Sequence, residues 1–487
     1  MSVINNFILN LLYQILIIIL PLITVPYISR VLGPQKVGTY GYTNSIVQYF
    51  ILLASLSCNL YGSRQIAYVR DNKEKLNKTF WEIVILKSLV SIIVIFLYFL
   101  FVNLVIPSQY KLYSMIQIIC IFTVLIDISW FFIGMEDLKK TVSRNLVVKL
   151  ISLGMIFTFV KSENDLWRYI IIIVLSDFIG QALLWFYIRK YMKFEKIKIS
   201  DSIKHLLPMV RLFIPQIAIQ VYVILDKTMI GYLTNVTEVG YYDMAQKIVK
   251  LPLGIVTSLG LVLLPRISNL YANGEEEKIK LYITKSLNFV LFLALPIYLG
   301  IVGISSNLVF WFLGETFLKS GTIMKITSII IVFIGISNVI GVQLMLPLGK
   351  EKEFTISVTT GAVVNFILNS IFIIKFASIG ASIATVVAEF SVTFVQFIIM
   401  KKYFDLKALS KEFTKYLVAS TTMFMIILFI NKVILIKGIL LTLIQIIIGI
   451  IVYFAMLFIL KSEILKFIIE KANDLFYSKF KWRVKNV

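Results

Sequence analysis

Long apolar segments joined by short polar connections follow one another along the whole chain. Runs such as Ile15–Leu20 contain no polar position and so lack the alternation of a half-buried strand. A bilayer core about 30 Å thick needs about 20 apolar residues per helix, and by that length the sequence predicts about fourteen spanning helices. The predicted spans are 7–29, 37–61, 80–104, 112–134, 142–161, 167–189, 209–232, 240–264, 284–306, 323–346, 354–375, 379–400, 413–431 and 438–460. The predicted fold class is an all-α polytopic membrane protein.

One segment of this pattern occurs twice. Val37-Gly38-Thr39-Tyr40 follows a turn predicted at Gly33–Pro34, and Val239-Gly240-Tyr241-Tyr242 is its counterpart in the second half. Arg64 and Arg266 have the same spacing, each at the far end of the helix after the turn, and they are candidate gating residues at the lobe ends. Repeated halves of membrane helices are typical of transporters with a binding site near the bilayer midplane.

The composition is typical of a membrane protein, and the distribution of its basic residues predicts the orientation in the membrane. The chain has 487 residues, of which 59% are hydrophobic and only 15% charged. The net charge of +22 does not indicate nucleic-acid binding, because no soluble face is long enough to carry a basic patch. Alternate connections and the C-terminal tail hold about 33 Lys and Arg residues against about 10 in the opposite set, which predicts that both termini are cytoplasmic.

The ends of the chain, its two cysteines and its one histidine do not indicate a catalytic or metal site. Phe7–Ile28 has no basic n-region and no cleavage site, so it is expected to be retained as the first span. Residues 461–487 mix apolar and basic positions at helical spacing, which predicts either an interfacial helix on anionic lipid or a partly disordered tail. Cys58 and Cys120 are expected to be packing residues, and His205 has no Cys or His neighbours that would form a metal site.

Several ionisable residues fall inside the predicted spans. A charge at mid-bilayer depth costs about 2.5–3.5 kcal/mol on insertion scales, so it normally faces a protein interior or a wet cavity. Glu82, Lys149 and Asp243 lie near predicted span ends, from which a side chain can reach the interface. The others are Lys87, Asp127, Asp177, Asp226, Lys227, Lys247, Lys250 and Glu389.

Polar side chains form stripes on the first two helices of each half. Asp243, Lys247 and Lys250 are spaced i, i+4, i+7, which puts them on one helix face. The neighbouring stripes hold Gln216, Gln220 and Lys227 in one span and Asn44, Gln48, Ser55 and Asn59 in another. These stripes either line a cavity or form interhelical hydrogen bonds that hold the helices together. For the lysines a cavity is favoured, because Lys is a poor neutral packing group.

A cationic cavity indicates an anionic ligand. Phosphate is favoured, because a multiply charged group needs several donors in a low-dielectric space. The candidate residues for binding a diphosphate and sugar are Arg30, Asn44, Gln48, Lys87, Gln216, Gln220, Lys227, Lys247 and Lys250. Asp127, Asp177, Asp226 and Glu389 are candidates for coupling transport to H⁺ or Na⁺, and no cofactor beyond such an ion is expected. Asp226 adjoins Lys227, so a structural ion pair is an equally open interpretation.

Several motifs carry a family resemblance. The turn from Arg30 to Tyr40 resembles the opening signature of the polysaccharide-transporter branch of the multidrug/oligosaccharidyl-lipid/polysaccharide (MOP) exporter superfamily. Similar motifs are Trp130–Glu136, Asp226–Gly231, Val239–Ile248, Leu264–Arg266, Pro347–Lys352, Asn365, Asn369 and Gly380–Glu389. The likeness covers residues 7–400 in order and is strongest to Wzx-type flippases.

The resemblance implies both an architecture and a function. It implies two six-helix lobes in a V, at 1–200 and 201–405, two extra helices within 406–460 and the basic tail 461–487. It implies a transporter, not an enzyme, that moves undecaprenyl-diphosphate-linked oligosaccharide repeat units to the outer leaflet of a bacterial cytoplasmic membrane by alternating access. The products would be O-antigen, capsule or exopolysaccharide. Membrane lipids, a polymerase and other polysaccharide-assembly proteins are the expected partners.

Three rival functions stay open at this point. A flippase of the lipid-linked peptidoglycan precursor suits a cationic cavity equally well. A drug/cation antiporter of the same superfamily would be better served by an acidic cavity. A membrane polysaccharide polymerase typically needs a large outer loop with catalytic side chains, whereas the predicted outer loops here are very short.

Overall fold

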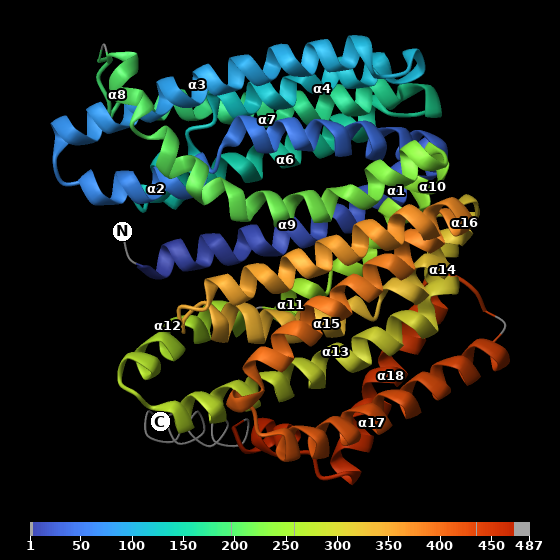
Figure 1. The fold of residues 1–487 in the computed structure, drawn as a ribbon. Helices are drawn as coiled ribbons and strands as arrows, with labels where there is room; N and C mark the ends of the chain where they lie inside the picture. Colours follow the sequence, from blue (N-terminus) through green and yellow to red (C-terminus); the bar gives the residue numbers. More distant parts are fainter. Residues whose placement is uncertain (1–2, 196, 258, 435, 472–487) are drawn as a thin grey trace, which may run out of the picture. The chain divides into compact units, whose positions relative to one another are not determined.

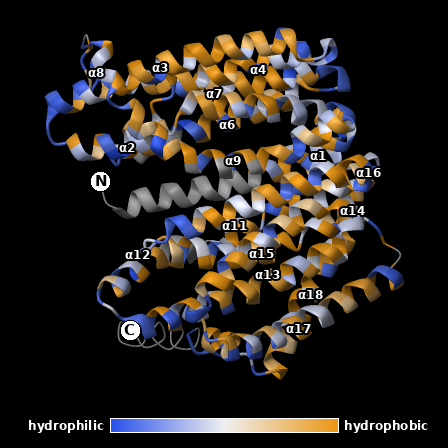
Figure 2. Ribbon diagram, viewed as in Figure 1, coloured by the Kyte–Doolittle hydropathy of each residue, from blue (hydrophilic) through white to orange (hydrophobic). Residues whose placement is uncertain are grey.

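The computed structural model describes residues 3–471 apart from 196, 258 and 435 (Figure 1). Every regular element within these residues is a helix, which confirms the predicted all-α class. In the part of the chain that the structure describes, eight helices are long and apolar enough to cross a membrane, and a bent pair, Glu315–Thr327 with Ile330–Met345, raises this number to nine. Figure 2 shows apolar residues along the helices and polar residues gathered in many of the connections. The chain is a multi-pass membrane protein.

The chain forms two compact units, Met1–Asp243 and Met244–Val487. The helices of the first unit are α1 (Val3–Ser55), α2 (Cys58–Val69), α3 (Lys73–Leu104), α4 (Ser108–Ile126), α5 (Ser129–Gly134), α6 (Leu138–Phe159), η1 (Glu163–Asp165), α7 (Leu166–Ile188), α8 (Ile199–Ile203) and α9 (Leu206–Leu233). Helix α10 (Val236–Lys250) crosses the boundary. Because α9 packs on α1 and α2, the first unit extends beyond the predicted lobe boundary at residue 200, and the division into lobes stays a prediction.

The second unit is also helical throughout its described residues. Its elements are α11 (Leu253–Thr257), α12 (Leu259–Ala272), α13 (Glu276–Phe312), η2 (Glu315–Phe317), α14 (Leu318–Thr327), α15 (Ile330–Ser337), η3 (Asn338–Met345), α16 (Glu351–Met400), η4 (Lys401–Tyr403), α17 (Leu406–Val433) and α18 (Ile439–Ile459). Residues 463–471 continue as helix, and residues 472–487 of the predicted basic tail lie outside the described residues.

Two helices each contain a pair of predicted spans. In α1 the predicted turn is a kink at Gly33, whose φ of 68° lies in the left-handed region that glycine adopts at no steric cost. In α16 the break between the predicted spans 354–375 and 379–400 is a kink at Ala377, with φ 51°. These merged helices account for part of the difference between eight spans and fourteen, and the figure of fourteen stays a prediction.

Aromatic residues form much of the core of the first unit. Trp130, Phe131 and Phe132 are each 0% exposed and belong to a cluster built from α2, α3, α5, α7 and α9. Trp130 stacks on Phe80 with ring centroids 5.6 Å apart. The motif at Trp130–Glu136 is therefore a packing element, and its last residue, Glu136, pairs with Arg70 at 2.8 Å.

Candidate functional site

The two copies of the repeated segment meet in the first unit. A Cβ atom placed on Gly240 would lie 2.1 Å from the carbonyl oxygen of Pro34 and 3.1 Å from the amide nitrogen of Gly38. A Cβ atom on Gly38 would lie 1.7 Å from the carbonyl oxygen of Val236. Glycine at both positions is what allows the backbones of α1 and α10 to touch here.

An ion pair and a hydrogen bond join α9 to α10 beside this crossing. The Lys227 ammonium pairs with the Asp243 carboxylate, and the Tyr242 hydroxyl donates a hydrogen bond to Asp226. Asp243 is 3% exposed, whereas the Lys227 side chain is 27% exposed. We call Asp226, Lys227, Tyr242 and Asp243 the α9–α10 cluster. It contains two acids and one lysine, so Lys227 is not an unpaired cation.

Hydroxyl groups extend this cluster towards α1. The Thr228 hydroxyl donates to Ser45 Oγ at 2.9 Å, and Tyr49 Oη lies 3.3 Å from Thr228 Oγ1. These contacts cross more than 170 residues of sequence, because α9 packs directly on α1. Nothing in the local pattern of α1 could have identified Ser45 or Tyr49 as partners of α9.

The other predicted substrate residues near α1, α9 and α10 differ in their surroundings. Lys247 and Lys250 follow Asp243 on α10 by one and two turns, the first half-buried and the second exposed. Arg30 is exposed on α1, one turn before the Gly33 kink, and Gln220 is exposed on α9. The remaining three are half-buried: Asn44, Gln48, and Gln216, which accepts a hydrogen bond of 3.0 Å from Ser57 Oγ.

The structure does not bring Lys87 or Asp127 to the α9–α10 cluster. Lys87 is 3% exposed and donates to the Asp127 carbonyl oxygen at 2.5 Å, with the Asp127 carboxylate 3.9 Å away. Asp127 ends α4, and its Oδ1 accepts from the Ser129 amide at the start of α5. This pair therefore stabilises a break between two helices, which accounts for both residues without a ligand.

A buried contact that the sequence did not reveal fixes the connection before α9. Glu82 of α3 is 1% exposed and accepts from Lys204 Nζ at 2.6 Å and from His205 Nε2 at 2.9 Å. The other ring nitrogen, Nδ1, lies 2.7 Å from the Tyr61 hydroxyl. Because a carboxylate only accepts hydrogen bonds, His205 Nε2 carries a proton and donates it to Glu82. More than 120 residues separate Glu82 from His205, so no local signal could have found this pair.

The remaining predicted site residues are carried by other helices, α2, α7, α12 and α16. Asp177 lies near the middle of α7 and lines a cavity of about 320 Å³ together with Lys149 of α6. Glu389 is half-buried on α16. Arg64 and Arg266 are exposed, and each guanidinium lies over a tyrosine ring, Tyr61 at 5.9 Å and Tyr282 at 4.4 Å. The ring contacts account for the position of both arginines, and a gating role stays a prediction.

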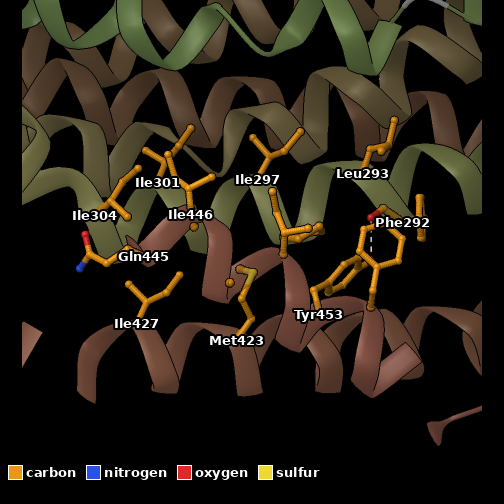
Figure 3. A pocket seen from close by; sticks show the side chains of 15 residues that line it. Phe292, Leu293, Ile297, Ile301, Ile304, Met423, Ile427, Gln445, Ile446 and Tyr453 are labelled. Carbon is orange, nitrogen blue, oxygen red and sulfur yellow. Dashed lines mark hydrogen bonds between the residues drawn. The ribbon is translucent and has the colours of Figure 1, made fainter. Parts of the chain in front are cut away.

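A second cavity lies within the second unit, among α13, α17 and α18 (Figure 3). It has a volume of about 380 Å³ and is lined almost wholly by apolar side chains, among them Phe292, Ile297, Met423 and Tyr453. A diphosphate or sugar would lose its hydrogen bonds to water there without replacement, so this cavity is not the head-group site.

The comparison with known families decides the classification. Residues 3–271 match the family described as "Polysaccharide biosynthesis protein", which is more than half of the chain. The chain belongs to this family. Membership in this family supports the predicted resemblance to polysaccharide transporters.

Several known proteins that are similar to this chain are named as transporters or flippases. A protein of Escherichia coli (strain K12) named for O-antigen transport is 25% identical over 381 residues, which cover 77% of this chain and 91% of that protein. A solved structure of the lipid II flippase MurJ, in an inward closed conformation, has a TM-score of 0.75 at 19% identity and covers 93% of this chain and 98% of that one. A multidrug resistance MATE family transporter of the MOP superfamily has a TM-score of 0.60 at 13% identity, covering 83% and 99%. At these identities the two structures establish the fold.

Proposed function

We infer that this chain is a flippase that moves undecaprenyl-diphosphate-linked oligosaccharide repeat units from the cytoplasmic to the outer leaflet. The observation that carries this inference is the match to the polysaccharide-biosynthesis family, together with likeness to an O-antigen transporter over 91% of that protein's length. The products would serve O-antigen, capsule or exopolysaccharide assembly, with a polymerase and other assembly proteins as partners. The surplus of Lys and Arg in alternate connections supports a cytoplasmic location for both termini.

The α9–α10 cluster suggests how a diphosphate would be held. Lys227 pairs with Asp243, so phosphate oxygens must compete with this carboxylate for the ammonium. A diphosphate carries more charge than one carboxylate and accepts more hydrogen bonds, which favours the exchange in a low-dielectric site. Lys247 and Lys250 continue the Asp243 face of α10 and would add positive charge to the same ligand. Breaking the Lys227–Asp243 pair would loosen α9 from α10 and so link binding to helix movement.

Direction requires an energy source, because a ligand shifts a conformational equilibrium only by its unequal affinity for the two states. Asp226 is the best placed candidate for proton or sodium coupling, since it is 5% exposed and adjoins the Lys227–Asp243 pair. Its bond from Tyr242 would have to rearrange when a proton or cation binds. Glu389, half-buried on α16, is the second candidate.

The test replaces the lysines of α10. In cells that lack their own flippase and express this chain, Lys247→Gln with Lys250→Gln should lower surface polysaccharide at least tenfold, because two charge-assisted contacts contribute about 3 kcal/mol or more. Lys411→Gln, an exposed lysine on α17, is the matched control. Surface polysaccharide at the unsubstituted level, with equal amounts of protein in the membrane, would refute diphosphate binding by these lysines.

The same cells distinguish lipid-linked oligosaccharide from the other possible cargoes. A chain that restores surface polysaccharide and fails to replace the flippase of the lipid-linked peptidoglycan precursor carries oligosaccharide. The opposite result would assign it the peptidoglycan precursor. Export of hydrophobic cations in place of both would make the chain a drug antiporter.

A further inference from the structure

The cavity beside α7 is lined by two ionisable residues, Lys149 and Asp177, that are not part of the proposed diphosphate site. It lies wholly within the first unit, where α1, α6 and α7 contact one another. Its volume is about 320 Å³. The lining residues are Leu20, Pro21 and Thr24 of α1, Val148, Lys149, Ser152, Leu153 and Ile156 of α6, and Tyr169, Ile173, Ser176 and Asp177 of α7.

Charges of opposite sign face this cavity at membrane depth. Lys149 lies near the middle of α6 and Asp177 near the middle of α7. Among the described residues no ion pair or hydrogen bond joins the two side chains, although both line the same space. Ionised groups at this depth are costly unless water or a ligand solvates them. The cavity is therefore polar and open to an occupant, unlike the apolar cavity of the second unit.

Hydroxyl groups and an aromatic ring complete the lining. Ser152 and Ser176 add hydroxyls on α6 and α7, and Thr24 uses its proton on the Leu20 carbonyl at 3.0 Å, which leaves its oxygen able to accept. The Tyr169 ring is held edge-to-face against Tyr40 at 5.3 Å between centroids. The lining thus combines donors, acceptors and apolar surface.

The helices that carry these groups are held firmly together. Arg144 of α6 is 8% exposed and donates to the Gly180 carbonyl oxygen at 3.0 Å and to Gln181 Oε1 at 2.8 Å, both on α7. Gly180 is one turn from Asp177. The distance between α6 and α7 is thereby fixed close to the cavity, as a pre-formed binding site requires.

The mixture of groups selects the chemical class of the occupant. A diphosphate needs several cationic donors, whereas Lys149 is the only basic residue among the described residues that line this cavity; the same ammonium disfavours a metal cation. A purely apolar ligand would leave both charges unsolvated. A neutral sugar matches all the lining groups. Its hydroxyls donate to a carboxylate and accept from an ammonium, while its C–H faces contact aromatic and aliphatic side chains.

We propose that this cavity binds one neutral sugar residue of the transported oligosaccharide, with Asp177 and Lys149 as its polar contacts. The assignment rests on the proposed flippase function and names the part of the cargo recognised by the first unit. A volume of about 320 Å³ is at the small end of ligand cavities, about 300–1,000 Å³, which fits one sugar residue and not a whole repeat unit. Asp177, predicted as an ion-coupling residue, is here a sugar ligand.

The test measures ligand-induced thermal stabilisation of the full chain purified in detergent. The probes are N-acetylglucosamine, galactose and glucose as neutral sugars, glucuronate, sodium chloride and inorganic pyrophosphate. At least one neutral sugar should raise the unfolding midpoint of the unsubstituted chain, as any ligand of the native state does. Asp177→Asn and Lys149→Gln should each weaken that sugar at least about tenfold, since each removes a charge-assisted hydrogen bond. Both variants should keep their response to pyrophosphate.

Controls make every outcome decisive. Glu163→Gln changes an exposed acid outside the cavity and should leave sugar binding unchanged. If Asp177→Asn fails to fold, Ser176→Ala tests the same wall with a smaller change. The proposal is overturned if no neutral sugar stabilises the unsubstituted chain, if Asp177→Asn binds sugar normally, or if sodium alone gives a shift that Asp177→Asn abolishes. The flippase function fails separately, if the unsubstituted chain does not restore surface polysaccharide.

Discussion

Contact between the two copies of the repeat gives a prediction whose size follows from the structure. In Gly240→Ala the new methyl group would lie 2.1 Å from the Pro34 carbonyl oxygen, more than 1 Å closer than an ordinary 3.4 Å contact. The obstacle is backbone, so no side-chain rotation relieves it. Overpacking costs up to about 3 kcal/mol. Replacing a glycine in a helix by alanine stabilises the helix by about 1 kcal/mol. The packed arrangement should therefore lose about 2 kcal/mol, which is about a 30-fold shift towards separated segments.

The assay reads separation of the segments directly. Thr39 is 5% exposed and adjoins Gly38, so a cysteine at this position should react slowly with maleimide while the segments are packed. The natural cysteines, Cys58 and Cys120, are first replaced by alanine. Gly240→Ala should then raise the labelling rate of Thr39→Cys about 30-fold.

Gly154→Ala supplies the matched control. It makes the same substitution in helix α6, where an added Cβ meets nothing within 4 Å, and labelling should stay unchanged. Equal labelling rates in the Gly240→Ala and Gly154→Ala backgrounds would refute the argument that the glycine contact holds the segments together. Gly38→Ala should act like Gly240→Ala, and the double variant should show less than the sum of both effects, because each breaks the same contact.

Three further predictions concern stability. Lys87→Met should lower the amount of folded protein strongly, since removing one partner of a buried pair costs about 3–5 kcal/mol, while Lys78→Met, at an exposed position, should leave it unchanged. Glu82→Gln should speed proteolysis of the connection before α9, because a neutral amide no longer forms an ion pair with Lys204; an unchanged cleavage rate would contradict a clamping role. On α13, Gly300→Ala should be tolerated, whereas Gly303→Ala should lower the unfolding midpoint, because its Cβ would lie 2.7 Å from a neighbouring side chain; equal midpoints would oppose this packing argument.

The α9–α10 cluster illustrates how far sequence reasoning reached for the candidate site. The stripe of Asp243, Lys247 and Lys250 follows from helical spacing, and so does the expectation that Lys227 lies near membrane depth. The sequence left open an ion pair of Lys227 with its neighbour Asp226, whereas in the structure Lys227 pairs with Asp243 on the next helix. Lys149 was discounted as a residue near a span end, but it faces a cavity with Asp177. Spacing along one helix gives the face of a residue and not the element opposite that face.

The sequence alone determined the helical membrane class and the change of direction at Gly33, which are local properties, and the internal repeat, which follows from comparing two segments of the chain. Apolar side chains can face lipid as well as protein, so a spanning helix can be recognised without knowing which helices pack against it. The tertiary structure decided which charges are paired, as in Lys87 with Asp127 and Glu82 with His205, and which face a cavity. Those outcomes depend on contacts between helices distant in sequence, and the energy of a buried charge is set by what packs against it.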